Sequence, residues 1–118
     1  MKYWLISDTY FNHTKLEEWG GRSGDWQDRM KKGMMQIPSE DTLIHLGDVC
    51  IGNDAEVHTF FQSLKCKKIL IRGNHDNKSV AWYLEHGWDF VNDGFWIEFM
   101  GRMILLSHRP MHPDMWCF

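Results

Sequence analysis

The sequence TLIHLGDV, residues 42–49, decides the fold class of this chain. The segment from Thr42 to Leu46 is short and rich in β-branched and aliphatic residues, which is typical of a buried strand. It ends at once in Gly47 and Asp48, which place a turn and a carboxylate directly after the strand. We therefore predict a buried strand with a polar group at its carboxyl end.

Two other segments repeat this arrangement. The apolar run Tyr3–Ile6 leads to Asp8, and the apolar run 68–71 leads to RGNHD, residues 72–76. Helical patterns separate these runs, and strands that alternate with helices predict an α/β fold with parallel strands. In open α/β sheets, ligands bind outside the carboxyl ends of the strands. We therefore expect Asp8 and the other side chains that follow the strands to meet there.

The rest of the chain predicts helices, a hairpin and a long loop. Asp25 and Asp54 are expected to cap the first two helices, and Gly87 is expected to end the third. His58 and His86 are expected at helix surfaces. The predicted elements are a loop over 9–25, helices over 26–36, 54–64 and 79–86, and a hairpin of the strands Phe95–Phe99 and Met103–Ser107.

The bulk composition predicts one soluble cytoplasmic domain, residues 1–118. The hydrophobic fraction of 43% indicates a packed core, and the formal net charge of -3 makes a nucleic acid an unlikely partner except as a substrate. The odd count of three cysteines, without CxxC spacing, favours a reducing compartment over a disulfide framework. The N-terminal sequence turns polar too soon for a signal peptide or a membrane span.

The strand ends carry residues that suit a metal site. Asp8, Asp48 and Asn74 would contribute oxygen ligands, and His108 after the last strand would contribute a nitrogen. Alone, each such residue is more often a turn former or a surface group. Together they form a set of oxygen and nitrogen ligands, which is typical of a site for a divalent Mn, Fe, Zn or Ni ion rather than of a soft thiolate site. We therefore predict that the chain binds one or two divalent ions.

These motifs resemble the calcineurin-like metallophosphoesterase superfamily, in particular its small bacterial and phage branch. The resemblance rests on Asp8, on HLGDV (45–49), on RGNHD (72–76) and on His108, and it extends from Tyr3 to about Met111. It implies a β-sandwich flanked by helices. It also implies hydrolysis of phosphodiesters or phosphomonoesters through a metal-bound hydroxide.

The resemblance also implies roles for single residues. Asp8 and Asp48 would hold the first metal, and Asp48 would bridge to a second that is completed by Asn74 and His108. His75 would be no ligand but would stabilise the transition state or protonate the leaving oxygen. Asp76 would orient the His75 ring.

Two departures from the family pattern concern the metal ligands. Tyr10 stands where the family has the histidine of its Asp-x-His motif, and a phenol with a pKa near 10 is a poor ligand. Tyr10 is therefore expected to form an aromatic wall of the substrate site, and His13 is expected to contact the substrate. The alternative role for Tyr10 is that of a ligand to a ferric-type ion. The family's final Gly-His-x-His is missing, and neither His112 nor Cys117 is expected to replace it.

The missing motif leads to two expectations. The domain is expected to be incomplete at its C-terminus, so the hairpin would present an apolar edge that a second copy, an exchanged segment or another partner covers. The function is expected to be that of a metal-dependent phosphoesterase acting on a phosphate-ester substrate, with activity reduced by the open metal sites. The alternative is a non-catalytic, degenerate phosphoesterase fold that binds a metal, a nucleotide or a protein partner.

Overall fold

The structure is a computed structural model that describes residues 2–13 and 24–109. Its centre is a parallel sheet with the strand order β1-β2-β3-β4. The strands are β1 (Tyr3–Ile6), β2 (Thr42–His45), β3 (Lys67–Ile71) and β4 (Phe90–Asn92). Most of the predicted loop over 9–25 and the tail with His112 and Cys117 lie outside the described residues.

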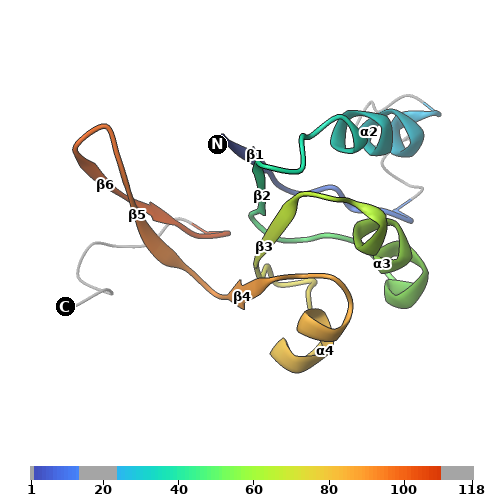
Figure 1. Cartoon of the computed structure of the whole chain (residues 1–118). Helices are drawn as coiled ribbons and strands as arrows, with labels where there is room; N and C mark the ends of the chain where they lie inside the picture. The colour runs from blue at the N-terminus through green and yellow to red at the C-terminus, as the bar shows by residue number, and fades with distance from the viewer. Residues whose placement is uncertain (1, 14–23, 110–118) are drawn as a thin grey trace.

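The sheet separates two layers (Figure 1). The helices α2 (Trp26–Met35), α3 (Asp54–Ser63) and α4 (Val80–Glu85) cover one face. The strands β5 (Phe95–Phe99) and β6 (Arg102–Leu106) form an antiparallel hairpin that lies on the opposite side. The predicted α/β class, with a parallel sheet and a second small sheet, is confirmed.

Apolar side chains fill both interfaces of the sheet. On the helix side, Phe61 and Trp88 are almost fully buried, with ring centroids 5.0 Å apart. On the hairpin side, Leu106 packs in a smaller cluster with Ile44 and Ile71. Burial of these side chains fixes which face each strand turns to the helices and to the hairpin.

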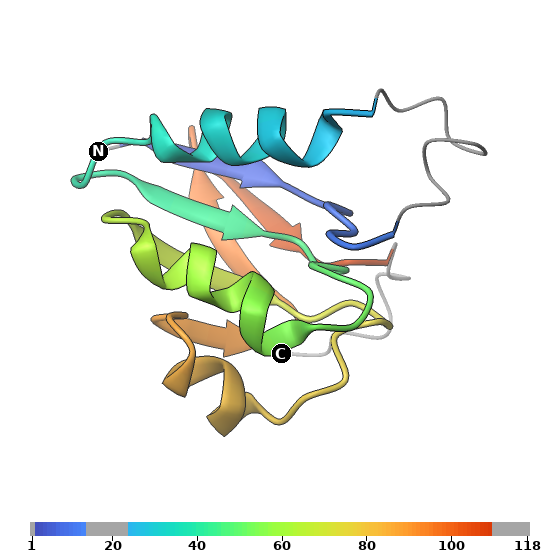
Figure 2. The same ribbon diagram turned by 90° about the vertical axis from the view of Figure 1, so that its right-hand side faces the viewer.

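The strand register brings the carboxyl ends to one level. Ile6 pairs with His45, and His45 pairs with Leu70 on the next strand. The arrows of β1, β2 and β4 point the same way in Figure 2, toward the loops that follow them. The residues just after β1, β2 and β3 therefore lie at the same edge of the sheet, as predicted.

Several local predictions need correction. The strand β4 was not predicted, because three residues are too few for a periodic signal. The cap of α3 is Asn53, one residue before the predicted Asp54, and Asp25 occupies the cap position of α2 without a side-chain cap hydrogen bond. His58 is fully buried among aromatic rings of α3 and α4, whereas a surface position was expected.

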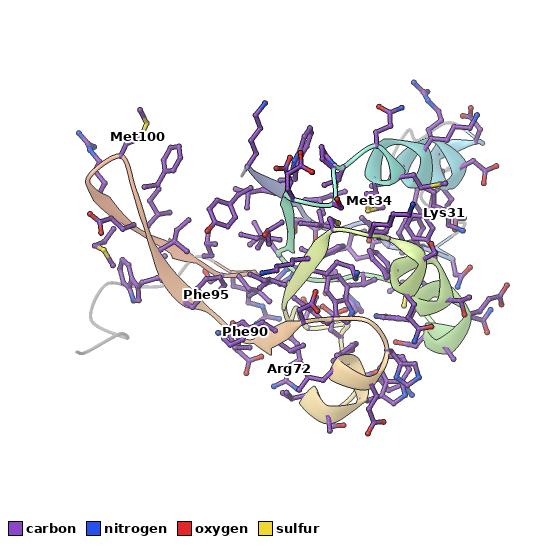
Figure 3. All side chains as sticks on the ribbon, viewed as in Figure 1. Lys31, Met34, Arg72, Phe90, Phe95 and Met100 are labelled. Atoms are coloured by element: carbon purple, nitrogen blue, oxygen red, sulfur yellow. The ribbon has the colours of Figure 1, made fainter. Side chains whose placement is uncertain are left out.

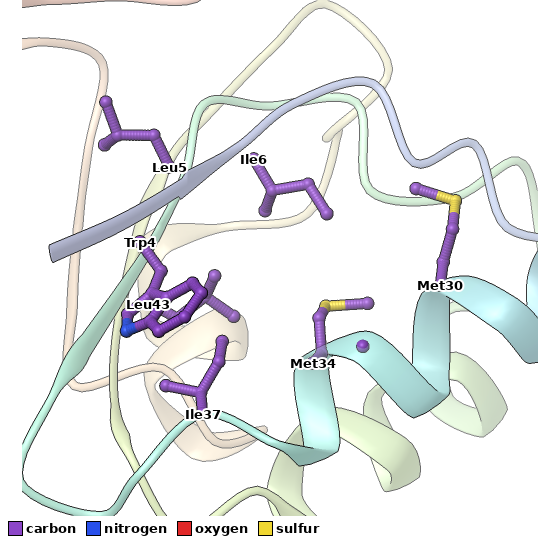
Figure 4. A pocket seen from close by; sticks show the side chains of 8 residues that line it. Trp4, Leu5, Ile6, Met30, Met34, Ile37 and Leu43 are labelled. Atoms are coloured by element: carbon purple, nitrogen blue, oxygen red, sulfur yellow. The ribbon is translucent and has the colours of Figure 1, made fainter.

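Two apolar regions remain at the surface. A groove of about 320 Å³ lies between β1 and α2, with Trp4, Met34 and Ile37 among its lining residues (Figure 4). None of the described residues that line it carries an acid, base or amide side chain. At the far end of the hairpin, Met100 is exposed (Figure 3), and the neighbouring Phe99 is exposed as well.

Among residues 2–13 and 24–109, the helices are all too short or too polar to cross a lipid bilayer.

Candidate metal centre

The site begins with two loops that run side by side. The chain after β1 pairs with the chain after β2, through hydrogen bonds from the Asp8 amide to the Gly47 carbonyl (3.0 Å) and from the Tyr10 amide to the Asp48 carbonyl (3.1 Å). Asp8 and Asp48 both adopt positive φ, of 54° and 59°. This left-handed conformation is uncommon outside glycine but is tolerated by aspartate, and it often occurs at functional sites.

Two glycines allow the loops after β2 and β3 to approach each other. A Cβ atom on Gly73 would lie 2.4 Å from Asp48 Oδ1, and one on Gly47 would lie 2.6 Å from the Gly73 amide nitrogen. Gly47 also has a φ of 109°, which side chains rarely permit. Any larger residue at either position would push Asp48 away from Asn74 and His108.

The predicted ligands Asp48, Asn74 and His108 come together at this edge. His108 Nε2 lies 3.2 Å from Asp48 Oδ2 and 3.1 Å from Asn74 Oδ1. His108 Nδ1 lies 2.8 Å from the Leu46 carbonyl oxygen, which can only accept, so Nδ1 carries the proton. In the neutral ring, Nε2 therefore presents a lone pair to two oxygen acceptors.

This donor set fits a divalent cation. Asp8, Asp48 and His108 each offer a ligand atom, and these atoms lie within 4.8 Å of one another. An ion held at about 2.1 Å by each ligand keeps neighbouring ligand atoms about 3 Å apart, close to the 3.2 Å between Asp48 Oδ2 and His108 Nε2. Three lone-pair atoms facing each other without a cation or proton between them would repel. The hydrogen bond from Nδ1 to Leu46 is the kind of contact that orients a histidine ligand.

Tyr10 occupies part of the same site. Its hydroxyl donates a hydrogen bond to Asp48 Oδ2 at 3.0 Å, and its ring meets the His13 ring edge-on with the centroids 5.9 Å apart. Burial and the nearby Asp48 carboxylate raise the pKa of Tyr10 to about 12. The phenol therefore stays protonated at neutral pH and acts as a donor to Asp48. Both predicted substrate contacts, Tyr10 and His13, lie beside the cluster.

His75 lies at the exposed rim of the site. Its Nδ1 is 3.1 Å from Asp48 Oδ2, and its backbone amide donates to Asp48 Oδ1 at 2.9 Å. Burial acts to raise the pKa of Asp48, but the hydrogen bonds from His75 and Tyr10 outweigh it and lower that pKa overall. Asp48 is therefore a carboxylate at neutral pH, as a metal ligand must be.

Asp76 holds the loops together. Its buried carboxylate accepts the backbone amides of Asp48 (2.7 Å), Val49 (3.0 Å) and Gly73 (2.7 Å). These bonds fix the turn after β2 against the turn after β3. Asp76 thus positions these two loops, and the predicted orientation of the His75 ring by Asp76 stays a prediction.

A buried polar network that the sequence did not reveal lies beneath the site. The Gly47 amide donates to His45 Nδ1 at 3.0 Å, so the Nε2 of the neutral ring carries the proton and donates to Thr9 Oγ1 at 2.9 Å. The Thr9 hydroxyl in turn donates to the Val49 carbonyl at 2.7 Å. His45 was expected to be packed or hydrogen-bonded, which is confirmed, but Thr9 had no predicted role. A histidine within an apolar strand is the signal that such a network exists.

Acid is expected to destabilise the fold through His45. Burial lowers the pKa of His45 to about 3, against 6.5 for an unperturbed ring. Below pH 6.5 the His45 ring of the unfolded chain binds a proton, whereas the ring in the folded chain stays neutral down to about pH 3. The free energy of unfolding therefore decreases as the pH falls through this window. At pH 5 the loss from His45 is about 2 kcal/mol.

Urea unfolding in EDTA at pH 7.5 and pH 5.0 measures this effect. Burial also lowers the pKa of His58, so His58 adds a loss of the same sign. The variant His45→Gln removes one of these groups and is expected to have a flatter pH dependence than wild type. An unchanged pH dependence in that variant would rule out His45 as the source.

Comparison with known proteins assigns the chain to a family. The family model for calcineurin-like phosphoesterases matches residues 1–115. The chain belongs to the calcineurin-like phosphoesterase family. The resemblance predicted from the strand-end motifs is thereby confirmed.

Two relatives extend the comparison. The crystal structure of a protein of unknown function from Aquifex aeolicus has a TM-score of 0.79 and 30% sequence identity, over 93% of this chain and 62% of that one. An uncharacterized protein from Methanocaldococcus jannaschii is 25% identical over 116 residues, which are 92% of this chain and 59% of that protein. The chain thus spans about three-fifths of the length of both relatives.

Proposed function

We propose that this chain is a divalent-metal-dependent phosphoesterase that hydrolyses a phosphodiester or phosphomonoester at the edge of the parallel sheet. The observation that carries the proposal is the convergence of three lone-pair atoms, in which His108 Nε2 lies 3.2 Å from Asp48 Oδ2 and 3.1 Å from Asn74 Oδ1. Asp8 is the fourth proposed ligand. Membership in the calcineurin-like phosphoesterase family supports the same chemistry.

The proposed mechanism assigns different tasks to the residues around the ligands. Asp8, Asp48, Asn74 and His108 would hold a divalent ion, which would supply Lewis-acid polarisation of a phosphoryl group and would make a bound water more acidic. His75, exposed at the rim, donates a hydrogen bond or a proton to the leaving oxygen. Tyr10 and His13 line the substrate side. Asp76 and the His45–Thr9 network keep the loops in register, which preserves the geometry that the reaction requires.

Hydrolysis of bis(p-nitrophenyl) phosphate with and without Mn²⁺ tests this function. We expect turnover that requires Mn²⁺ and is abolished by EDTA. The variant His75→Ala is expected to reduce kcat by about 10²-fold or more while leaving Mn²⁺ affinity within a few-fold of wild type. Wild-type kcat in His75→Ala would contradict the role of this histidine, and no turnover with any of Mn²⁺, Fe²⁺, Zn²⁺ or Ni²⁺ would contradict the proposed activity.

One observation favours a second candidate function. The Tyr10 hydroxyl donates to Asp48 Oδ2, the oxygen that also faces His75 and His108, and so competes with a metal for it. A chain in which this competition prevails would bind one ion or none and would act as a binding module. Metal analysis combined with the turnover assay separates the two functions, because a binding module shows at most one ion per chain and no hydrolysis.

Replacing Tyr10 tests how strongly it limits metal binding. The variant Tyr10→His is expected to bind Mn²⁺ at least about tenfold more tightly, or to bind a second ion, because an imidazole replaces a neutral phenol beside Asp8 and Asp48. Tyr10→Phe is the matched control, since it removes the hydrogen bond to Asp48 without adding a ligand. Equal Mn²⁺ affinity and stoichiometry in the two variants would contradict this interpretation.

We also propose that a second copy of the chain covers the apolar residues of the hairpin. Phe99, Met103 and Ile104 are exposed, and the two-stranded sheet leaves both of its edges without a neighbouring strand among the described residues. Light scattering at high protein concentration is expected to give more than a single-chain mass, and a single-chain mass would contradict the proposal.

The free, buried thiols of Cys50 and Cys66 support a cytoplasmic location.

A further inference from the structure

A second pocket opens beside the proposed metal centre. It measures about 350 Å³ and lies where the chain leaves β3, β4 and β6. Asn74 and His108 belong both to this pocket and to the ligand cluster, so the two sites share a wall. The other lining residues are Arg72, Gly73, Asp93, Ser107 and Arg109.

Arg72 is held in place on one side of this pocket. Its Nε and Nη2 donate to the two carboxylate oxygens of Asp93 at 2.8 and 3.1 Å, and its Nη1 donates to the Lys78 carbonyl at 3.3 Å. A guanidinium has five N–H groups, so these three bonds leave two for a ligand. The bidentate contact with Asp93 fixes the plane of the guanidinium before any ligand binds.

Arg109, which follows β6, provides a second cation to the lining of the pocket. It is exposed, and it follows His108 directly in the sequence. The Ser107 hydroxyl donates to the Arg109 carbonyl, which tightens the turn after β6 and keeps Arg109 at the pocket. Within residues 2–13 and 24–109, the ion pairs involve Asp48 and Asp93 but not Arg109.

The charges of the lining select the kind of ligand. Arg72 and Arg109 contribute two positive charges and Asp93 one negative charge, so these side chains leave a net charge of +1 in the pocket. No Phe, Tyr or Trp is among the described lining residues, so a nucleobase or aryl group would find no stacking partner among them. Guanidinium groups match phosphate oxygens in geometry and charge.

We propose that this pocket binds a second anionic phosphate of the substrate, next to the phosphate that is hydrolysed. The preferred substrates are therefore phosphate esters or anhydrides with two neighbouring phosphates, such as organic diphosphates. This inference rests on the proposed function, because the scissile phosphate is taken to lie at the metal centre. Arg109 is the residue that discriminates between singly and doubly phosphorylated compounds.

Calorimetric titration of the Mn²⁺-loaded full chain tests the pocket without requiring turnover. The probes are methylphosphonate and methylenediphosphonate, which carry one and two phosphoryl groups and resist hydrolysis. We expect wild type to bind the diphosphonate at least tenfold more tightly. Arg109→Gln is expected to lower this ratio about fivefold or more, because a charged hydrogen bond is lost at an exposed site. Arg102→Gln, an exposed arginine on the hairpin, is the matched control and is expected to keep the wild-type ratio.

The outcomes separate this inference from the proposed function. A ratio in Arg109→Gln equal to that of wild type would overturn the pocket assignment, even if bis(p-nitrophenyl) phosphate is hydrolysed. A ratio that depends on Arg109 in a chain without hydrolytic activity would support the pocket and overturn only the catalytic proposal. Failure of wild type to bind either probe would overturn the pocket assignment, whatever the result of the hydrolysis assay.

Discussion

Replacement of Asp48 by asparagine is expected to reduce hydrolysis about 10³-fold and to weaken Mn²⁺ binding at least tenfold. Asp48 is 1% exposed, and its Oδ2 atom lies within 3.2 Å of Tyr10 Oη, His75 Nδ1 and His108 Nε2. Asparagine keeps the size of the side chain but removes the negative charge. If its amide nitrogen replaces Oδ2, it also turns a donor toward the Tyr10 hydroxyl.

The control for this substitution is Asp28→Asn. Asp28 is an exposed residue in the first turn of α2, so its replacement changes the net charge equally without touching the site. Turnover of bis(p-nitrophenyl) phosphate and calorimetric titration with Mn²⁺ should be unchanged in Asp28→Asn. Thermal unfolding of both variants without metal checks that Asp48→Asn remains folded. Wild-type turnover and wild-type Mn²⁺ affinity in a folded Asp48→Asn would contradict the account.

Replacement of Gly73 by alanine is expected to cost about 1–3 kcal/mol of stability and to disrupt the metal centre. The new Cβ atom would lie 2.4 Å from Asp48 Oδ1 and 2.8 Å from the Asp48 amide nitrogen. That amide is held by Asp76 at 2.7 Å, so the loop has little freedom to retreat. The expected result is a fall in Tm by roughly 4–12 °C for a domain of this size, together with weaker Mn²⁺ binding.

Gly33→Ala is the matched control for this prediction. Gly33 lies inside α2, and a Cβ atom there would have no atom within 4 Å apart from its chain neighbours and the backbone of its own helix. Alanine is the better helix former, so Gly33→Ala is expected to raise stability by up to about 1 kcal/mol. A Gly73→Ala variant as stable as wild type, with unchanged Mn²⁺ affinity, would show that the close approach of the two loops is not required.

The sequence predicted the parallel part of the fold because local pattern and position agreed there. The runs before Asp8, Asp48 and Asn74 are apolar and end in polar turns, and helical patterns separate them. Parallel strands then require their carboxyl ends to lie together, so the sequence alone groups the proposed ligands at one edge of the sheet. The strand β4 was not predicted, because its three residues, Phe90, Val91 and Asn92, are too few to show a hydrophobic period. Only its pairing with β3 defines it as a strand.

Other features of the site depend on contacts between distant segments. The hydrogen bond from Tyr10 to Asp48 joins residues 38 positions apart, and the one between Thr9 and His45 joins residues 36 apart. Neither spacing carries a periodic signal. Asp76 was predicted at the site, but only the structure shows that its carboxylate accepts backbone amides from two loops.

Crystals soaked with Mn²⁺ test the central claim most directly, through an anomalous difference map that locates the ion. We expect a peak bounded by Asp8, Asp48 and His108, within about 2.5 Å of a ligand atom from each. The same soak of Asp48→Asn is expected to show a much weaker peak or none. A map of the wild-type chain at saturating Mn²⁺ with no peak among these three residues would contradict the account.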